Sequence, residues 1–187
     1  LANPTGVPGV TPLMRRVAFP GSHERQLGMP GRHGTGPAVL ALQEADVLLA
    51  VGARFDDRVT GKPSEFAPDA MVVHIDIDPA EISKIRVADI PIVGDAKDVI
   101  ADLTAAYRDV RAKAKPDLTA WWTRLNELRT RFPLGSPEPE DGLLSPHYVI
   151  DRIGQLTGPE AIHSQDVGQH QRWPATYVKY ARPTART

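Results

Sequence analysis

The fold is decided by the stretch VLLAVGARFDDRVTG at residues 47–61, where an apolar run ends in glycine and is followed at once by charged residues. A second run, MVVHIDI at 71–77, is also β-branched and nearly unbroken. Such runs are typical of parallel strands that are covered on both faces. They alternate with helical patterns at 37–45 and 99–114, and a third apolar run lies at 90–93. This alternation predicts an α/β fold, a parallel sheet flanked by helices.

The composition excludes several classes of protein. The 187 residues include 22 Lys+Arg and 23 Asp+Glu, so net charge gives no reason to expect nucleic acid or an anionic membrane as a partner. The absence of cysteine excludes disulfides, thiolate zinc sites, iron–sulfur clusters and cysteine nucleophiles. No apolar run approaches the roughly 18 residues of a membrane span. The six histidines show no metal-ligand spacing, and no Ser/His/Asp set is identifiable.

The positions of proline and glycine divide the chain into three blocks, at 1–114, 115–144 and 145–187. The middle block holds an amphipathic helix, whose apolar stripe should serve packing, and then an exposed linker. The stripe consists of Trp121, Leu125, Leu128 and Phe132.

The last block is too short for a core of its own. We expect in it a helix capped by Ser145, a strand at 161–163 and an apolar turn at 173–178. Because the sequence starts with Leu1 and has no signal-peptide character, we expect it to begin inside a longer protein.

Polar residues follow each predicted strand. Arg54 is suited to a phosphate, and Asp76 to ribose hydroxyls, while Asp95 follows the third strand. Ligands of parallel sheets bind at these carboxyl ends, so together the three strand ends predict a crevice of nucleotide shape. The alternatives are ion pairs on a solvated loop around Arg54 and a helix cap at Asp95. Asp78, with Pro79 and Glu81 after it, is explained by the start of a helix.

Two further segments could contact phosphate. The loop GMPGRHGT at 28–35 combines three glycines with His33, and Thr35 can cap the helix that follows. An ordinary connection with a capped helix is the alternative. The segment GQHQ at 168–171 supplies histidine and glutamine donors beside a glycine, which suit a diphosphate.

These segments resemble the large catalytic subunit of acetohydroxyacid synthase (acetolactate synthase). The likeness covers essentially the whole chain and rests on LGMPGRHGT at 27–35, GARFDDRVTG at 52–61, HIDIDPAEI at 74–82 and VGQHQ at 167–171. It implies a thiamine-diphosphate-dependent transferase and flavoprotein of the bacterial cytoplasm. Such an enzyme condenses pyruvate with pyruvate or 2-ketobutyrate through hydroxyethyl-thiamine diphosphate, in the biosynthesis of the branched-chain amino acids valine, isoleucine and leucine.

The resemblance also implies domain limits and site residues. Residues 1–114 would be most of the central FAD domain, 115–144 the linker with its helix, and 145–187 the start of the thiamine-diphosphate domain. The residues assigned to FAD are Leu13, Met14, Gly31, His33, Gly34, Arg54, Asp56, Asp76, Ile77, Asp95 and Ala96. Those assigned to thiamine diphosphate are Gln169, His170 and Gln171.

The flavin of this family is mainly structural, so no catalytic residue is expected in the chain. The Mg²⁺ ligands would lie outside it, and so would the glutamate that activates the thiazolium. We therefore expect a fragment that is inactive alone. The complete enzyme would be a homodimer or homotetramer with a small regulatory subunit.

The sequence departs from the family pattern at four positions. Arg32 stands where Met is usual, Val17 where Gly is usual, and Arg172 and Pro174 where Met or a small residue is common. Pro174 would disturb a helix unless it lay in the first turn.

Two alternatives to acetohydroxyacid synthase remain. One is a sister carboligase or decarboxylase such as glyoxylate carboligase, against which the Arg-Phe-Asp-Asp-Arg run argues. The other is an adenine-nucleotide-binding module without catalysis.

Overall fold

The chain divides into two compact units in the computed structural model. Unit 1 comprises residues 1–7 and 40–124, and unit 2 comprises residues 8–39 and 125–187. Helices α2 (Gly36–Gln43) and α5 (Thr119–Arg131) contribute residues to both. The structure describes residues 1–113, 116–135, 142–158 and 160–180.

Parts of all three expected blocks therefore lie outside the described residues. These are 114 of the first block, 115 and 136–141 of the linker, and 159 and 181–187 of the last block. The side chain of Val17 also lies outside them. The limits of the domains expected from the sequence stay a prediction.

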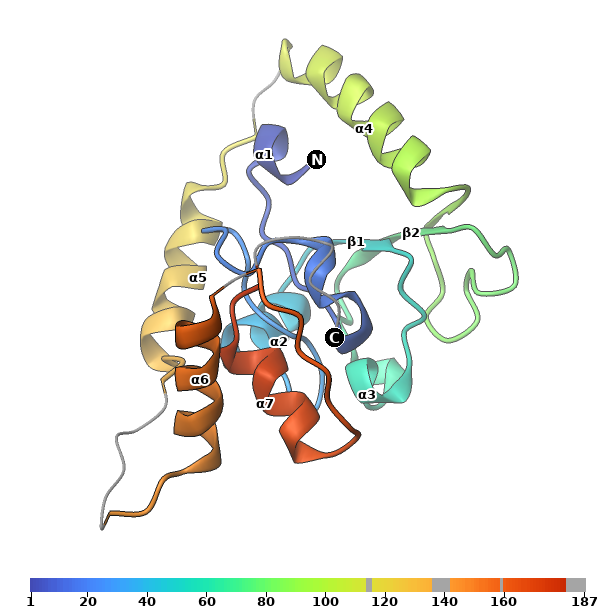
Figure 1. The fold of residues 1–187 in the computed structure, drawn as a ribbon. Coiled ribbons are helices and arrows are strands. Elements are labelled where there is room, and N and C mark those ends of the chain that lie inside the picture. The colour runs from blue at the N-terminus through green and yellow to red at the C-terminus, as the bar shows by residue number, and fades with distance from the viewer. Residues whose placement is uncertain (114–115, 136–141, 159, 181–187) are drawn as a thin grey trace. The chain divides into compact units, whose positions relative to one another are not determined.

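Three parallel strands form the sheet of unit 1, in the order β1 (Val47–Val51), β2 (Met71–Asp76) and β3 (Ile90–Val93). Val51 lies opposite Ile75. β1 and β2 run side by side in Figure 1. The α/β fold predicted from the apolar runs is therefore confirmed. Because the strands are parallel, their carboxyl ends meet at one edge of the sheet.

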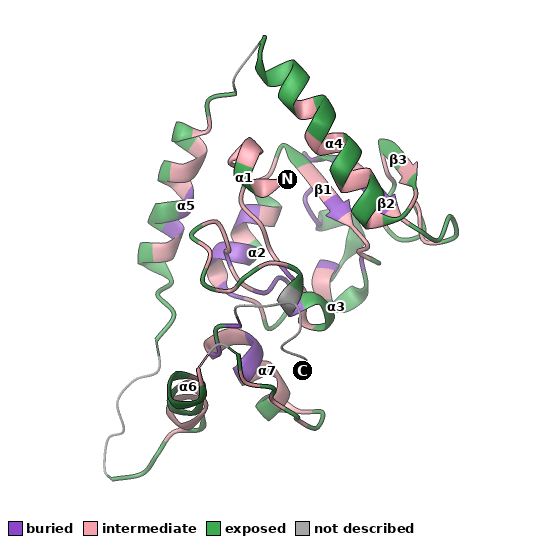
Figure 2. Cartoon of the chain, turned by 45° about the horizontal axis from the view of Figure 1, so that its top comes forward, coloured by how far each residue is buried: buried purple, intermediate pink, exposed green. Residues whose placement is uncertain are grey.

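The core of unit 1 is built from β2 and the segments after β1 and before β2. Val72 and Ile75 of β2 are fully buried. The rings of Phe55 and Phe66 meet edge to face, with their centroids 6.1 Å apart. Helix α4 (Ala96–Arg111) contributes no buried residue, as Figure 2 shows. Sheet and loops therefore supply most of the buried apolar surface that stabilises this unit.

Side-chain caps fix where several helices begin. Asp95 accepts a hydrogen bond from the amide of Lys97 (2.8 Å), and Ser145 accepts one from the amide of Tyr148 (3.2 Å). Both caps were predicted. Asp56 caps the short helix α3 (Asp57–Thr60), which was not. The remaining elements are α1 (Ala2–Thr5) and the 3-10 turn η2 (Pro63–Glu65) in unit 1, and η1 (Leu13–Ala18), α6 (Pro146–Thr157) and α7 (Gln169–Tyr177) in unit 2.

The prediction that a helix starts at Asp78 is wrong. Residues 79–83 form successive turns, in which the amide of Glu81 bonds the carbonyl of Asp78 at 3.1 Å. Asp78 does accept a hydrogen bond from the amide of Ala80. Ser83 then takes a left-handed conformation (φ +61°), which stops helical propagation. A local cap is present, but no helix follows it.

The glycine-rich segment of unit 2 closes into a tight loop. The amide of Thr35 bonds the carbonyl of Met29 (2.9 Å), and the Thr35 hydroxyl donates to the carbonyl of Leu27 (2.7 Å). The same hydroxyl accepts from the amide of Ala38 (3.3 Å), so Thr35 caps α2 as predicted. A Cβ at Gly34 would lie 2.3 Å from the carbonyl oxygen of Met29, so only glycine fits there.

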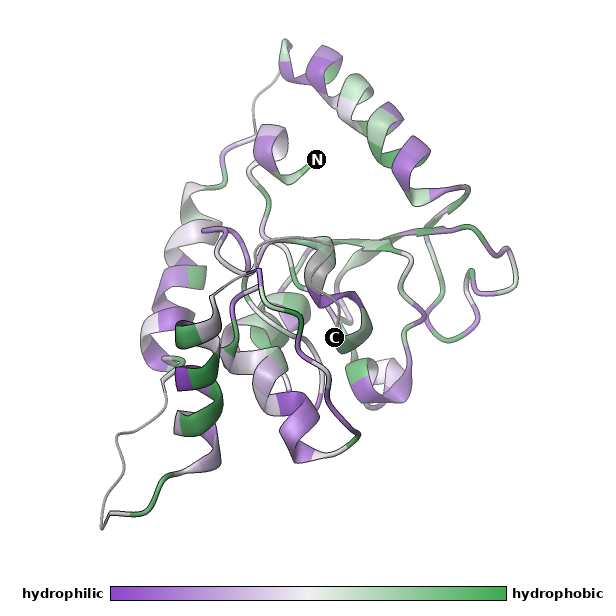
Figure 3. Ribbon diagram, in the orientation of Figure 1, coloured by the Kyte–Doolittle hydropathy of each residue, from purple (hydrophilic) through white to green (hydrophobic). Residues whose placement is uncertain are grey.

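The last block packs within unit 2 rather than forming a core of its own. Leu125 and Leu128 of α5 are fully buried, which confirms the packing role of the stripe at these positions. Ala175, Val178 and Tyr180 are also buried. The carbonyl of Tyr180 accepts a hydrogen bond from the amide of Gly21 (2.9 Å). One side of α6 stays apolar and exposed, as Figure 3 shows.

Two expectations for the last block are wrong. Residues 161–163 form no strand, because no neighbouring strand pairs with them among the described residues. Residues 173–177 belong to α7 instead of a turn. Pro174 lies inside α7, beyond its first turn. Within the described part of the chain, no helix is both long and apolar enough to cross a membrane.

The loop geometry predicts a large effect of a single methyl group. Gly34→Ala should destabilise the chain by about 1–3 kcal/mol, because the new Cβ would press on backbone atoms that have no room to move. Urea unfolding measures this change. Gly135→Ala is the control, since its Cβ would meet no atom within 4 Å. Equal midpoints for both variants would contradict the loop geometry.

A second prediction concerns acid. Arg124 donates two hydrogen bonds to Glu44 (2.8 and 2.7 Å), which lower the pKa of Glu44 below its usual value of 4.5. Stabilisation by this pair is full above pH 4.5 and is lost as the pH falls through the lower folded-state value. The side chains are 33% and 41% exposed, so Glu44→Gln should cost only about 0.2–1 kcal/mol at neutral pH.

Unfolding measured across acidic pH tests this. The difference between parent and Glu44→Gln should shrink toward zero in acid. A difference that stays constant with pH would show that the carboxylate charge plays no part. Glu65→Gln is the control, because it makes the same chemical change in the Lys62–Glu65 ion pair, whose side chains are more exposed than those of Glu44 and Arg124.

Candidate functional site

The carboxyl ends of the three strands bring one group of predicted residues together in unit 1. The amide of Gly52, after β1, bonds the carbonyl of Ile75 in β2 at 2.8 Å. The amide of Gly94, after β3, bonds the carbonyl of Asp76 at 2.9 Å. These bonds continue the sheet one residue past the strands. Asp76, at the end of β2, and the loops that carry Arg54 and Asp95 therefore lie at the same edge, as the sequence predicted.

Arg54 projects from this edge with 73% of its side chain exposed. Its Nε lies 3.5 Å from Oε2 of Glu81. Glu81 also accepts a hydrogen bond from Lys84 (2.7 Å), and Lys84 and Arg54 together lower the pKa of Glu81. An ion pair was one reading of this loop, but the partner is Glu81, which the sequence analysis assigned to a helix start. An exposed guanidinium held by a single long contact can exchange it for a phosphate.

Asp56 does not pair with Arg54. It accepts hydrogen bonds from the amides of Arg58 (3.0 Å) and Val59 (3.2 Å) and so begins α3. Arg58 instead pairs with Asp57 at 3.2 Å, with both side chains exposed. One Asp56 oxygen is therefore engaged by the backbone, and any contact between Asp56 and a ligand would involve the other.

Asp76 keeps acceptor capacity at the edge. Its Oδ1 accepts from the amide of Asp78 (2.9 Å), and its side chain is partly buried. A carboxylate has about four acceptor positions, so one backbone contact leaves room for ribose hydroxyls. Ile77 is exposed beside it. Asp95 caps α4 and is exposed, and Ala96 is the first residue of that helix.

Sequence analysis assigned no role to two side chains beneath this edge, His74 and Phe55. His74 is fully buried, and its Nε2 lies 2.8 Å from the carbonyl oxygen of Ala53. Phe55 is 6% exposed and meets the His74 ring edge to face at 5.0 Å. Side chains alternate between the two faces of a strand, so the sequence alone places His74 on the same face of β2 as Asp76. This alternation was the signal from which a role for His74 at the edge could have been predicted.

A second group of predicted residues lies in unit 2. Gly31 and Gly34 shape the tight loop, and the amide of Gly34 bonds the carbonyl of Gly31 at 2.8 Å. His33 is exposed at its tip. Leu13 and Met14 lie in η1, and Met14 is strongly exposed. An exposed methionine side chain can pack on a planar ring.

Electrostatics connect this loop with the start of α7. Partial desolvation, the charge of Arg172 and the charge of Arg32 lower the pKa of His33. These effects favour the uncharged form of the imidazole. Arg32 and Arg172 are two of the four departures from the family pattern, and they act on the same side chain.

Gln169, His170 and Gln171 form the first turn of α7. Gly168 precedes them at φ +149°, and no side chain caps the helix. The amide of Gln171 bonds the carbonyl of Gly168 at 3.2 Å. Gln169 and His170 are exposed, so their side chains and free backbone amides are available to a diphosphate.

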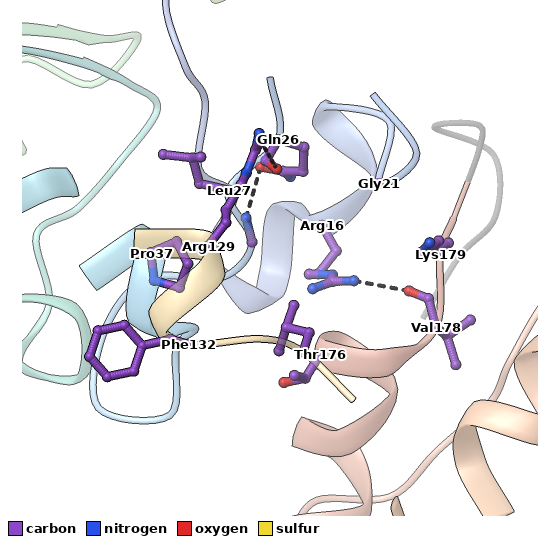
Figure 4. Close-up of a pocket in the computed structure, with 12 residues that line it drawn as sticks. Arg16, Gly21, Gln26, Leu27, Pro37, Arg129, Phe132, Thr176, Val178 and Lys179 are labelled. Carbon is purple, nitrogen blue, oxygen red and sulfur yellow. Dashed lines mark hydrogen bonds between the residues drawn. The ribbon is translucent and has the colours of Figure 1, made fainter. Parts of the chain in front are cut away.

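A cavity of about 210 Å³ lies within unit 2, and none of the predicted site residues lines it. Figure 4 shows Arg16 pointing at the carbonyl of Val178, to which it donates a 3.1 Å hydrogen bond. Burial lowers the pKa of Arg16. Arg129, on another wall, is bound to the carbonyls of Glu24 and Gln26. Both cations thus serve the packing of unit 2, and we do not assign the cavity to a cofactor.

The side chains at each of the two sites indicate which cofactor could bind there. Gly52 has φ +59°, and a Cβ there would meet nothing within 4 Å, so the strand edge is open to a ligand. With an arginine and carboxylates around it, this edge fits a dinucleotide such as FAD. The turn at 169–171 fits a diphosphate. The described residues contain no cluster of three or more His, Cys, Asp or Glu that could hold a metal ion.

Comparison with known proteins shows the family of the chain. Residues 1–103 match the family described as thiamine pyrophosphate enzyme, central domain. The chain is 54% identical over 183 residues to acetolactate synthase of Mycobacterium leprae. It is 49% identical over 179 residues to the acetolactate synthase large subunit of Corynebacterium glutamicum, and 44% identical over 179 residues to the chloroplastic acetolactate synthase 1 of Oryza sativa.

These alignments take in 98%, 96% and 96% of this chain, but only 29%, 28% and 28% of the relatives. The chain thus spans less than a third of the length of the curated relatives it matches. The family match covers more than half of the chain. This chain belongs to the thiamine pyrophosphate enzymes, with residues 1–103 in their central domain and acetolactate synthase large subunits among its relatives.

Proposed function

We propose that the chain is part of the large subunit of an acetolactate synthase, which condenses pyruvate with pyruvate or 2-ketobutyrate in branched-chain amino acid biosynthesis. The observation that carries this proposal is the edge of the sheet in unit 1. There Asp76 ends β2, and Arg54 and Asp95 follow the neighbouring strands β1 and β3, in a chain whose relatives are named acetolactate synthases. The role of the chain in that enzyme would be to hold FAD and to begin the thiamine-diphosphate site.

Each FAD-binding residue has a role in this proposal. Arg54 would bind the diphosphate, with Asp56 beside it, and Asp76 would accept hydrogen bonds from ribose. Ile77, Asp95 and Ala96 would border the adenosine. In unit 2, Leu13, Met14 and the loop with Gly31, His33 and Gly34 would border the flavin. The flavin's role would be structural, and none of these residues would transfer a proton or a hydride.

Gln169, His170 and Gln171 would donate hydrogen bonds to the diphosphate of thiamine diphosphate. When bound, that cofactor supplies the nucleophilic carbon that attacks a ketoacid. The Mg²⁺ ligands and the activating glutamate would come from outside the 187 residues. We further propose a homodimer or homotetramer with a small regulatory subunit. The bacterial cytoplasm is the proposed location, supported by the higher identity to the bacterial relatives than to the rice one.

Removing the Arg54 charge tests the proposed FAD site. In the complete protein, Arg54→Ala should weaken FAD binding by roughly 1.5–3 kcal/mol, the scale of a charged hydrogen bond. Flavin fluorescence titration measures the affinity. Lys62→Ala is the matched control, because it also removes an exposed, singly paired cation, but one that stands at the start of η2 and pairs with Glu65. An FAD affinity unchanged in Arg54→Ala would leave Arg54 as the surface partner of Glu81 only.

The 187 residues alone should not make acetolactate. They cover less than a third of the relatives, and their described part contains no group that could hold a metal ion. The measurement is acetolactate formation from pyruvate with thiamine diphosphate, magnesium and FAD present. Turnover by this chain alone would contradict the proposed division of the active site. Binding of ADP but not FAD by the complete protein would instead favour a nucleotide-binding module.

A further inference from the structure

His74 has one hydrogen-bond partner at the edge described above. Its Nε2 lies 2.8 Å from the carbonyl oxygen of Ala53, 21 residues earlier in the chain. A carbonyl oxygen can only accept, so Nε2 must carry the proton. The side chain is fully buried, so no solvent competes for this bond. The geometry therefore places a proton on Nε2 of His74.

The other ring nitrogen has no partner. Nδ1 of His74 is buried and forms no hydrogen bond with any described residue. In the Nε2–H tautomer it is a bare acceptor, and leaving it unpaired costs about 1–3 kcal/mol. A buried histidine with an unpaired nitrogen stabilises the fold less than an apolar side chain of similar size would. Such an exception calls for a cause other than packing.

His74 also contacts the residue on the other side of Arg54. Phe55 stands edge to face on the His74 ring at 5.0 Å and 83°. Its backbone is left-handed (φ +52°), which is unfavourable for a residue with a large side chain. Such a conformation persists only where the surroundings impose it. The His74 ring is one of the two aromatic rings that hold Phe55, and Phe66 is the other.

His74 thus holds both neighbours of Arg54, Ala53 by its carbonyl and Phe55 by its ring. The Arg54 side chain lies between these two fixed neighbours. It extends toward solvent and pairs there with Glu81. We propose that His74 is a positioning residue, whose Nε2–H group presents Arg54 to the diphosphate of the dinucleotide. This inference rests on the proposed function, from which it takes the dinucleotide as the ligand. The positioning of Arg54 by His74 does not depend on that ligand.

The experiment uses two substitutions at position 74 in the complete protein. His74→Gln keeps a donor the same number of bonds from Cβ, so it can still reach the Ala53 carbonyl. His74→Phe fills the space without a donor. We expect FAD binding to weaken about tenfold in His74→Phe and to stay within about threefold of the parent in His74→Gln. Ile75→Val, on the other face of β2, controls for a general loss of packing.

A double-mutant cycle separates positioning from a merely structural role. If His74 acts through Arg54, His74→Phe should add less than about twofold to the loss already caused by Arg54→Ala. A further tenfold loss in the Arg54→Ala background would show that His74 only stabilises the fold. Equal weakening in His74→Phe and Ile75→Val would overturn the proposal in the same way.

A ligand-free readout keeps the two proposals distinguishable. Nitrogen-15 NMR should find His74 as the Nε2–H tautomer in the parent. The Arg54 Nε resonance should move in His74→Phe but not in His74→Gln or Ile75→Val. An Nδ1–H tautomer, or an Arg54 resonance unmoved in His74→Phe, would overturn the positioning role. Failure of the parent to bind FAD, with these shifts present, would overturn the proposed function and leave His74 as the residue that orients Arg54.

Discussion

Pairing of β2 with a parallel neighbour on each side is the interaction on which the rest of unit 1 depends. It buries Val72 and Ile75 on opposite faces of the strand, and it aligns the ends of β1 and β3 with Asp76. Because the strands run in one direction, Asp76 and the loops with Arg54 and Asp95 all lie at the same edge. A slip of one residue in β2 would move His74 and Asp76 to the other face and separate them from the loop after β1.

Sequence reasoning succeeded where the signal was local and periodic. The runs at 47–51, 71–76 and 90–93 are strands, and Asp95 and Ser145 cap their helices. It failed where a local motif depended on distant partners. Asp78, Pro79 and Glu81 form a good helix start, yet Glu81 is held by Arg54 and Lys84, and turns follow. Likewise residues 161–163 have strand composition, but a strand needs a neighbour, and composition does not supply one.

The candidate site was predictable only in part, for the same reason. A phosphate-binding role for Arg54 follows from the residue type and its place after a strand. That its neighbours Ala53 and Phe55 rest on a buried histidine does not follow, because it depends on a contact between residues 21 apart. The effect of Arg32 and Arg172 on His33 was equally hidden. Each of these two departures from the family pattern is visible in the sequence. Only the folded unit shows that both arginines act on His33.

Pro174 changes how α7 behaves. A proline has no backbone N–H, so the carbonyl of His170 lacks the helical partner it would otherwise have at position 174. The turn that carries Gln169, His170 and Gln171 is therefore joined to the buried half of the helix, with Ala175, by one hydrogen bond fewer. Such a helix bends at low cost at that point. The exposed first turn of α7 can therefore change its direction relative to the other half of the helix, which the burial of Ala175 holds in place.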